Sequence, residues 1–262
     1  MTNDGAVQPI IEAREVSKHF GRVVALQGVS IEAHLGQVVA LLGDNGAGKS
    51  TLIKILSGVF APDGGRLFLE GQPASFRSPH EARSKGVSTV YQDLALCDRM
   101  SIARNFVLGG EPTRRVGPLR FLNLAKAREM AKAALEDIGI SVRDPDEPVS
   151  VLSGGERQSI AIARAIHYGA RVLILDEPTS ALGVREAAKV QTYILGARDR
   201  GVAVILITHN LHHAVPVSDH FVILKGGRNA GSYEKGDVAE ADLAEIISRL
   251  PPPGYDENGA QL

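Results

Sequence analysis

The sequence has a single cysteine, Cys97, and no tryptophan. One cysteine excludes an internal disulfide and fits a reducing compartment, and we assign Cys97 no chemical role. The longest apolar run, residues 202–207, is far shorter than the roughly 18 residues that a membrane-spanning helix needs. Residues 1–8 are polar and lack the apolar stretch of a secretory signal. We therefore expect any action at a membrane to depend on partner proteins.

The chain also has almost no net charge. Its 29 Lys and Arg nearly balance its 30 Asp and Glu, which gives a net charge of −1. The total offers no global electrostatic reason to expect nucleic acid or a membrane surface as a partner, although it does not exclude a local patch. With 262 residues, 44% of them hydrophobic, the chain can form one large α/β domain or two small ones. No internal repeat is visible, which favours one domain.

The clearest feature that is present is a glycine-rich stretch between an expected strand and an expected helix. Residues 38–42 are a continuous apolar run typical of a buried strand, and apolar residues recur at helical spacing over residues 52–56. Glycines at such a turn let backbone N–H groups approach an anion, and the helix N-terminus adds positive partial charge. The pattern predicts a nucleotide-binding loop in which Lys49 reaches the β- and γ-phosphates and Ser50 ligates Mg²⁺. The loop consists of Gly43, Asp44, Asn45, Gly46, Ala47, Gly48, Lys49, Ser50 and Thr51.

Two further buried strands are expected to end in polar side chains. Residues 172–175 lead into Asp176 and Glu177, and residues 202–207 lead towards His209. Adjacent carboxylates at the end of a buried strand are costly unless they have a role. Asp176 suits Mg²⁺ coordination and Glu177 suits a base that orients and deprotonates water. His209, at the same sheet edge, could reach a γ-phosphate, although a lone histidine is usually structural.

Three other positions are ambiguous by themselves. Gln92 follows an expected strand at residues 87–91, where α/β proteins place ligand contacts, but it could simply begin a loop. Phe20 lies beside a turn between antiparallel strands expected within residues 10–35, where an aromatic ring can stack on a nucleobase or belong to the core. His212 and His213 look like an exposed helix face, and we assign them no role.

Between about residues 94 and 160 the pattern changes to helices and loops. Ser101 is expected to cap a short helix and Asn123 a longer one. The segments between and after these helices are rich in Gly, Pro and charge and are expected to be loops. This region predicts a helical insertion into the α/β core.

The insertion ends with Leu152-Ser153-Gly154-Gly155-Glu156-Arg157-Gln158. Ser153 and Glu156 have the spacing of a capping box, so a well-capped helix would explain them. Gly154 and Gly155 point further, because they weaken a helix and expose N–H groups at its N-terminus. The stretch therefore also predicts a second anion site.

In this order the motifs resemble those of the ATP-binding cassette family. In that family they are the Walker A loop (43–51), the Q-loop (Gln92), the signature sequence (152–158), the Walker B strand with its catalytic glutamate (173–177) and the switch histidine (His209). The signature sequence is highly specific to the family. The resemblance implies a P-loop NTPase core with an antiparallel β subdomain and an inserted α-helical subdomain. It covers residues 10–248 as one nucleotide-binding domain, and we expect residues 249–262 to be a disordered tail.

The resemblance further implies a head-to-tail dimer that hydrolyses ATP with Mg²⁺. Ser153, Gly154 and Gly155 of one copy would close over the ATP on the Walker A loop of the other. Phe20 falls where the family places its adenine-stacking aromatic. The implied catalytic residues are Lys49, Glu177 and His209, and the implied metal site contains Ser50, Gln92 and Asp176.

The implied setting is the cytoplasmic face of the inner membrane. The helical insertion and Gln92 would face a membrane permease, served in turn by an extracytoplasmic solute-binding protein, with no nucleic acid as partner. Several stretches look like the bacterial monosaccharide importers, namely residues 78–82, 86–87, 94–109 and 181–183. The expected function is thus to energise import of a monosaccharide, with two copies beside a ribose-, xylose- or fructose-type permease.

One position departs from the family, because Gly183 stands where an aspartate usually touches the partner's site. The resemblance therefore does not extend to that contact. The main alternative function is a soluble cassette ATPase acting on ribosomes or DNA, but such proteins usually carry tandem cassettes, coiled-coil insertions or basic arms. A phosphate-loop kinase or GTPase would leave the signature sequence unexplained.

Overall fold

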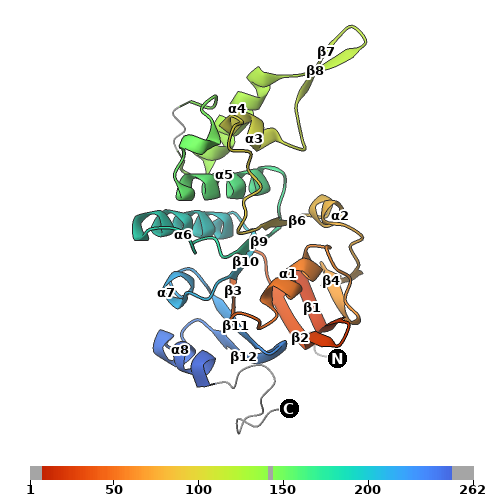
Figure 1. Cartoon of the computed structure of the whole chain (residues 1–262), viewed down its shortest axis with the longest axis vertical. Coiled ribbons are helices and arrows are strands. Elements are labelled where there is room, and N and C mark those ends of the chain that lie inside the picture. Colours follow the sequence, from red (N-terminus) through yellow and green to blue (C-terminus); the bar gives the residue numbers. More distant parts are fainter. Residues whose placement is uncertain (1–7, 141–143, 250–262) are drawn as a thin grey trace.

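The computed structural model describes residues 8–140 and 144–249, which form an α/β molecule with a separate helical end (Figure 1). Its largest sheet has six strands in the order β12-β11-β3-β10-β9-β6. All neighbours pair in parallel except β11 and β12, which form an antiparallel hairpin. The strands are β3 (Val38–Leu42), β6 (Val87–Val90), β9 (Val172–Asp176), β10 (Ala203–Ile207), β11 (His220–Lys225) and β12 (Arg228–Glu234). Strands β3 and β10 are buried at every residue, which explains their unbroken apolar sequences.

A second sheet of four strands confirms the antiparallel strands expected before and after the glycine-rich loop. Its order is β2-β1-β4-β5. The strands are β1 (Ile11–Phe20), β2 (Val23–Ala33), β4 (Gly64–Leu69) and β5 (Gln72–Ala74). Helix α1 (Lys49–Leu56) packs between the two sheets, because its apolar residues share one core with both. The glycine-rich loop is therefore held between two layers.

The helical end has a core of its own. Helices α3 (Ile102–Val107), α4 (Leu124–Asp137) and α5 (Gly154–His167) bury apolar side chains against one another. The expected caps are confirmed, since Ser101 accepts the N–H of Arg104 at 3.3 Å and Asn123 that of Lys126 at 3.1 Å. The remaining helices are α2 (Pro79–Ser84), α6 (Val184–Asp199), α7 (Leu211–Ala214) and α8 (Glu240–Arg249), and a 3₁₀ turn spans Val149–Val151.

The sequence predicts only loop between α3 and α4, and the structure differs in this segment. It contains a β-hairpin of β7 (Thr113–Val116) and β8 (Leu119–Leu122), which projects from the helical end (Figure 1). Both strands are exposed at every residue. Without a buried face they lack the apolar–polar alternation by which strands are identified, so the expectation of a loop was wrong.

No helix within the described residues is both long and apolar enough to cross a bilayer. The tail expected at residues 249–262 lies outside the described residues, apart from Arg249 at the end of α8.

Candidate functional site

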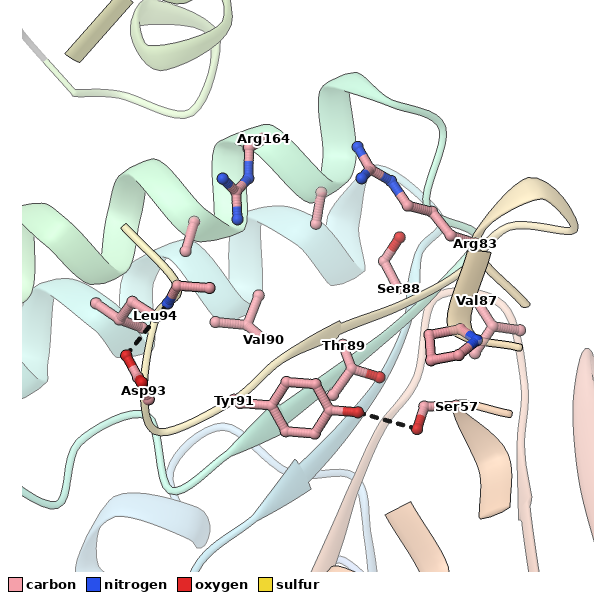
Figure 2. Close-up of a pocket in the computed structure, with 14 residues that line it drawn as sticks. Ser57, Arg83, Val87, Ser88, Thr89, Val90, Tyr91, Asp93, Leu94 and Arg164 are labelled. Carbon is pink, nitrogen blue, oxygen red and sulfur yellow. Dashed lines mark hydrogen bonds between the residues drawn. The ribbon is translucent and has the colours of Figure 1, made fainter. Parts of the chain in front are cut away.

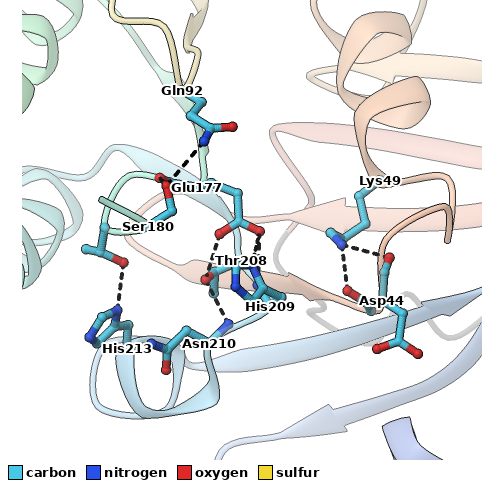
Figure 3. Close-up of polar contacts among 11 residues, drawn as sticks. Asp44, Lys49, Gln92, Glu177, Ser180, Thr208, His209, Asn210 and His213 are labelled. Carbon is cyan, nitrogen blue, oxygen red and sulfur yellow. Dashed lines mark hydrogen bonds and ion pairs between the residues drawn. The ribbon is translucent and has the colours of Figure 1, made fainter. Parts of the chain in front are cut away.

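Three parallel strands bring the polar residues of the site to one edge of the large sheet. Strand β10 lies between β3 and β9, and its last residue, Ile207, pairs with Leu41 on one side and Asp176 on the other. The glycine-rich loop follows β3, Glu177 follows β9 and His209 follows β10. Because the carboxyl ends of parallel strands share an edge, these groups face a common space (Figure 3).

The glycine-rich loop forms the expected strand-to-helix turn. Gly48 is the N-cap of α1 with φ of 102°, and a Cβ there would lie 2.8 Å from the carbonyl oxygen of Ala25. A side chain would thus be both strained and blocked. Lys49 is only 8% exposed, and its ammonium donates to the carbonyl oxygens of Gly43 at 2.5 Å and Asp44 at 3.0 Å (Figure 3). Burial lowers the pKa of Lys49 because the charged ammonium is partly removed from water. An anion beside it would stabilise the charged form.

The turn between β11 and β12 supports the glycine-rich loop from behind. The N–H of Gly227 donates to the carbonyl oxygen of Ala47 at 3.1 Å. The ammonium of Lys225 lies 3.1 Å from Oδ2 of Asp44 and donates to the carbonyl oxygen of Ile247 in α8 at 3.2 Å. Lys225 thereby connects the loop to helix α8, a contact that no pattern in the sequence predicts.

Glu177 is the most constrained side chain of the site. Its φ of 49° lies in the left-handed region, which is unfavourable for a residue other than glycine. Its carboxylate accepts the hydroxyl of Thr208 at 3.2 Å and the backbone N–H of His209 at 3.1 Å. Nδ1 of His209 lies 2.8 Å from its Oε1 atom (Figure 3). Sequence reasoning placed Glu177 and His209 at the site but missed the hydroxyl beside them.

Asp176 ends β9, Gln92 follows the neighbouring strand β6, and Ser50 lies at the start of α1, so their elements meet at the same edge of the sheet. Burial and the neighbouring charge of Glu177 raise the pKa of Asp176, so an added cation would favour its charged form. Ser50 is exposed on the first turn of α1. The amide nitrogen of Gln92 donates to the Ser180 hydroxyl at 3.4 Å (Figure 3). Its amide oxygen accepts no hydrogen bond within the described residues. Three oxygen donors of this kind suit Mg²⁺ that is shared with phosphate.

Phe20 lies at the end of β1 and is 42% exposed. One edge of its ring contacts Phe60, with ring centroids 5.3 Å apart. Phe20 pairs with Val23, two residues along β2 from Ala25, whose carbonyl lies beside Gly48. The Lys18 ammonium lies 5.7 Å from the Phe20 ring centroid, so the ring is partly exposed beside Phe60 and Lys18 and is not a core residue.

The signature segment forms its predicted cap but does not meet the glycine-rich loop. Ser153 and Glu156 make a complete capping box at the start of α5. A Cβ on Gly154 would lie 2.6 Å from Cδ2 of Leu182, so this glycine contacts the segment that follows Glu177. Within the described residues, no hydrogen bond or ion pair joins Ser153, Gly154 or Gly155 to residues 43–51. The two helix N-termini that the sequence marks as candidate anion sites therefore lie apart within one chain.

His213 has a contact that the sequence did not predict. Its Nδ1 atom lies 2.8 Å from the hydroxyl of Thr179, which is buried two residues after Glu177. The amide of Gln191 in α6 donates to its carbonyl oxygen at 3.1 Å. The expectation of an exposed face was wrong for His213, because α7 turns this side chain inward, whereas His212 is exposed and pairs with Glu240.

A cavity of about 150 Å³ lies next to Gln92, between β6, α2 and α5 (Figure 2). Arg83 and Arg164 line one side of it and Asp93 another. The hydroxyl of Thr89 is buried there and has no hydrogen-bond partner among the residues that the structure describes. The pKa of Arg164 is lowered because the side chain is buried and because the positive charge of Arg83 lies nearby. Two guanidinium groups and one carboxylate therefore line the cavity, and Arg164 also donates to the carbonyl oxygen of Asn105 at 3.3 Å.

Comparison with known proteins places these features in a family. The family model for ABC transporters matches residues 26–180. The chain is 42% identical over 253 residues to the fructose import ATP-binding protein FrcA of Rhizobium meliloti, covering 95% of this chain and 97% of that protein. It is 43% identical to the xylose/arabinose import ATP-binding protein XylG of Sulfolobus acidocaldarius, with 91% and 94% covered. It is 42% identical to the ribose import ATP-binding protein RbsA 1 of Rubrobacter xylanophilus, over 96% of this chain but 48% of that protein.

Solved structures agree on the fold. The ADP conformation of an ATP-binding cassette of an ABC transporter has a TM-score of 0.76 and 25% identity, with 92% of this chain and 95% of that chain covered. A dimeric bacterial ABC transporter cassette has a TM-score of 0.70 at 22% identity, with 86% and 98% covered, which supports the fold alone. The predicted α/β core, antiparallel sheet and helical insertion are confirmed. The chain therefore belongs to the ABC transporter family, as an ATP-binding cassette.

Proposed function

We propose that two copies of this chain bind two ATP molecules between them and hydrolyse them to drive import of a monosaccharide through a separate permease. Residues 10–248 act as the single nucleotide-binding domain. The observation that carries the proposal is the convergence of Lys49, Asp176 and the Glu177–His209 pair at one sheet edge. A buried cation, a strand-end carboxylate and a constrained base are the groups that phosphoryl transfer to water requires.

Each residue has a distinct task in this proposal. Phe20 stacks on the base, while Lys49 and the amides of residues 43–51 hold the phosphates. Ser50, Gln92 and Asp176 hold Mg²⁺, which when bound neutralises charge on the β- and γ-phosphate oxygens. His209 leaves Glu177 to contact the γ-phosphate, and Glu177 then accepts a proton from the attacking water.

The second copy supplies the wall that each chain lacks. Ser153, Gly154 and Gly155 of the partner approach the γ-phosphate with the N-terminus of α5. Two apolar side chains beside this surface support a contact between copies, because Val184 is 86% exposed and Val151 63% exposed. Burying them in the dimer would contribute to its stability.

Mixing two inactive variants tests this arrangement. Lys49→Ala removes the phosphate contact of its own site, and Ser153→Arg blocks the site of its partner. In a mixture, half of the dimers are mixed, and each contains one site with both native residues. ATPase activity should reappear on mixing, and a mixture that stays inactive at high protein concentration would contradict closure by the partner.

The proposed substrate follows the relatives, whose names describe fructose, xylose/arabinose and ribose import. The cavity lined by Arg83 and Arg164 is the proposed place where an acidic segment of the permease docks (Figure 2). Closure of the dimer would then move the permease, with the chain held at the cytoplasmic face of the inner membrane. A secreted solute-binding protein would deliver the sugar on the other side.

Reconstitution tests the transport role. The chain should support sugar uptake into vesicles that hold the permease of its own operon, and Glu177→Gln should abolish uptake. Salt-sensitive binding to RNA or DNA, with no association with a permease, would instead favour a cassette ATPase that acts on nucleic acid.

A further inference from the structure

The β7–β8 hairpin carries exposed apolar residues and unpaired positive charge at the same place. Val116, Leu119 and Phe121 are 56%, 59% and 47% exposed. Arg114, Arg115 and Arg120 make no hydrogen bond or ion pair within the described residues, and residues 112–123 contain no Asp or Glu. Nothing in the nucleotide site accounts for this surface.

The cross-strand pairs of the hairpin change from apolar at its tip to positively charged one residue further back. Val116 and Leu119 pair across the strands next to the Gly117-Pro118 turn. The next pair towards the base is Arg115 with Arg120. Successive residues are about 3.4 Å apart along a strand and point to opposite faces, so the two guanidinium groups lie one residue behind the apolar tip, on the other face of the hairpin.

The Arg115–Arg120 pair indicates what the hairpin lacks. Like charges directly opposite on neighbouring strands are destabilising. An anion between the two guanidinium groups would remove that repulsion, and guanidinium matches phosphate in two-pronged geometry. The apolar tip in front of them would need a non-aqueous environment at the same time.

Tyr168 connects the segment before the hairpin to Arg83, which lines the cavity described above. Arg83 lines that cavity, and its guanidinium carbon lies 5.0 Å from the ring centroid of Tyr168. The Tyr168 hydroxyl donates to the carbonyl oxygen of Gly110 at 3.3 Å, three residues before β7 begins. Two successive contacts therefore link the residues before the hairpin to the proposed permease-docking cavity.

We propose that the β7–β8 hairpin inserts its apolar tip into the headgroup region of an anionic bilayer, with Arg115 and Arg120 binding lipid phosphates. This inference rests on the proposed function, which places the cassette beside a membrane. The tip would enter to the shallow depth of interfacial segments, and each arginine near the surface contributes about a fivefold gain in partitioning. The bilayer thereby becomes a second support for the helical end, independent of the permease.

Flotation of the full chain with lipid vesicles tests the proposal without a permease. The chain should bind vesicles that contain phosphatidylglycerol better than vesicles of phosphatidylcholine alone, and added salt should weaken that binding. Arg115→Glu/Arg120→Glu should lower binding to the anionic vesicles by more than about 25-fold. Arg66→Glu/Lys189→Glu is the matched control, since it makes the same change in net charge at two exposed positions away from the hairpin.

A second variant separates the apolar tip from the charge. Leu119→Ser should also lower binding, with no change of charge. Melting temperature and ATPase activity in solution should be unchanged in all three variants, so failure of the proposed ATPase would be seen separately. Equal binding by the hairpin and control double variants would overturn the proposal. So would a loss seen only with permease-containing vesicles of neutral lipid, which would identify the hairpin as a protein contact.

Discussion

Nδ1 of His209 lies 2.8 Å from Oε1 of Glu177, so the imidazole occupies the carboxylate that is proposed to accept a proton from water. The Thr208 hydroxyl and the N–H of His209 bond to the same carboxylate. Three donors therefore hold the carboxylate of Glu177. The imidazole can rotate away as a side chain, whereas the N–H of His209 is part of the backbone and the Thr208 hydroxyl bonds the other carboxylate oxygen. Release of the imidazole towards a γ-phosphate would therefore remove one of the two contacts of Oε1, while the N–H of His209 and the Thr208 hydroxyl still hold the carboxylate.

Glu177→Gln is expected to lower ATPase activity by about 10²- to 10⁴-fold, because an amide cannot accept the proton of water. The amide keeps the size of the carboxylate, so ATP should still bind and the ATP-bound dimer should accumulate. Turnover assays and size-exclusion chromatography with ATP would measure both effects. Glu234→Gln is the matched control, since Glu234 also pairs with a histidine, His220 at 2.9 Å, but on the β11–β12 hairpin. Near-native turnover of Glu177→Gln would exclude Glu177 as the base.

Asp176→Asn is expected to stabilise the chain without nucleotide while weakening Mg²⁺-dependent ATP binding. Burial and Glu177 raise the pKa of Asp176 in the folded state, so its charged form costs folding free energy. The folded form loses stability relative to the Asn variant as pH rises from the ordinary value of 3.8 through the raised pKa. The difference in melting temperature should thus be small near pH 4 and larger at pH 7, at about 2–4 °C per kcal/mol. A variant that melts below the wild type at pH 7 would contradict this reasoning.

Gly183→Asp restores the residue usual in the family and should be tolerated. Gly183 is the N-cap of α6 with φ of −69°, and a Cβ there would meet no atom within 4 Å. Aspartate is a better N-cap than glycine by a few tenths of a kcal/mol, so the melting temperature should rise slightly. If the family contact is also regained, ATPase activity should reach half its maximum at a lower protein concentration. Gly183→Leu provides the comparison, as it fills the same space without a capping oxygen.

Lys225→Ala is expected to raise the KM for ATP by about two- to fivefold, because a partly exposed ion pair contributes at most about 1 kcal/mol. The variant removes the contact with Asp44 and the link to Ile247 in α8. The kcat should change little, since Lys225 supports the loop and contacts no reacting group. Lys235→Ala is the control, because Lys235 bonds a carbonyl oxygen, that of Pro216, outside the loop. An equal KM in the two variants would show that Lys225 does not position the loop.

The features that the sequence predicted correctly depend on residues close together in the chain. The caps at Ser101, Asn123 and Ser153 each need only the next three residues. The shared edge of Asp176 and His209 follows from a general rule for parallel strands. Contacts between distant segments left no such pattern, as with Lys225 and Asp44, which are 181 residues apart.

The β7–β8 hairpin and His213 were missed for a different reason. The hairpin has no face against the core, so its sequence carries no periodic signal. His213 looks like a surface residue because its neighbour His212 is one, and only the packing of α7 against Thr179 distinguishes them. In both cases the environment of a side chain, and not its type, decides its role.

Gly154 lies against Leu182 of the same subunit, and this contact could couple hydrolysis at the two sites of the proposed dimer. In the proposed dimer, the segment that one subunit would extend to its partner's nucleotide lies against the segment that follows its own Glu177. Withdrawal of that segment after phosphate release at the partner's site would displace the residues that follow Glu177 in the first subunit. Hydrolysis at one site would thereby alter the position of the catalytic base at the other.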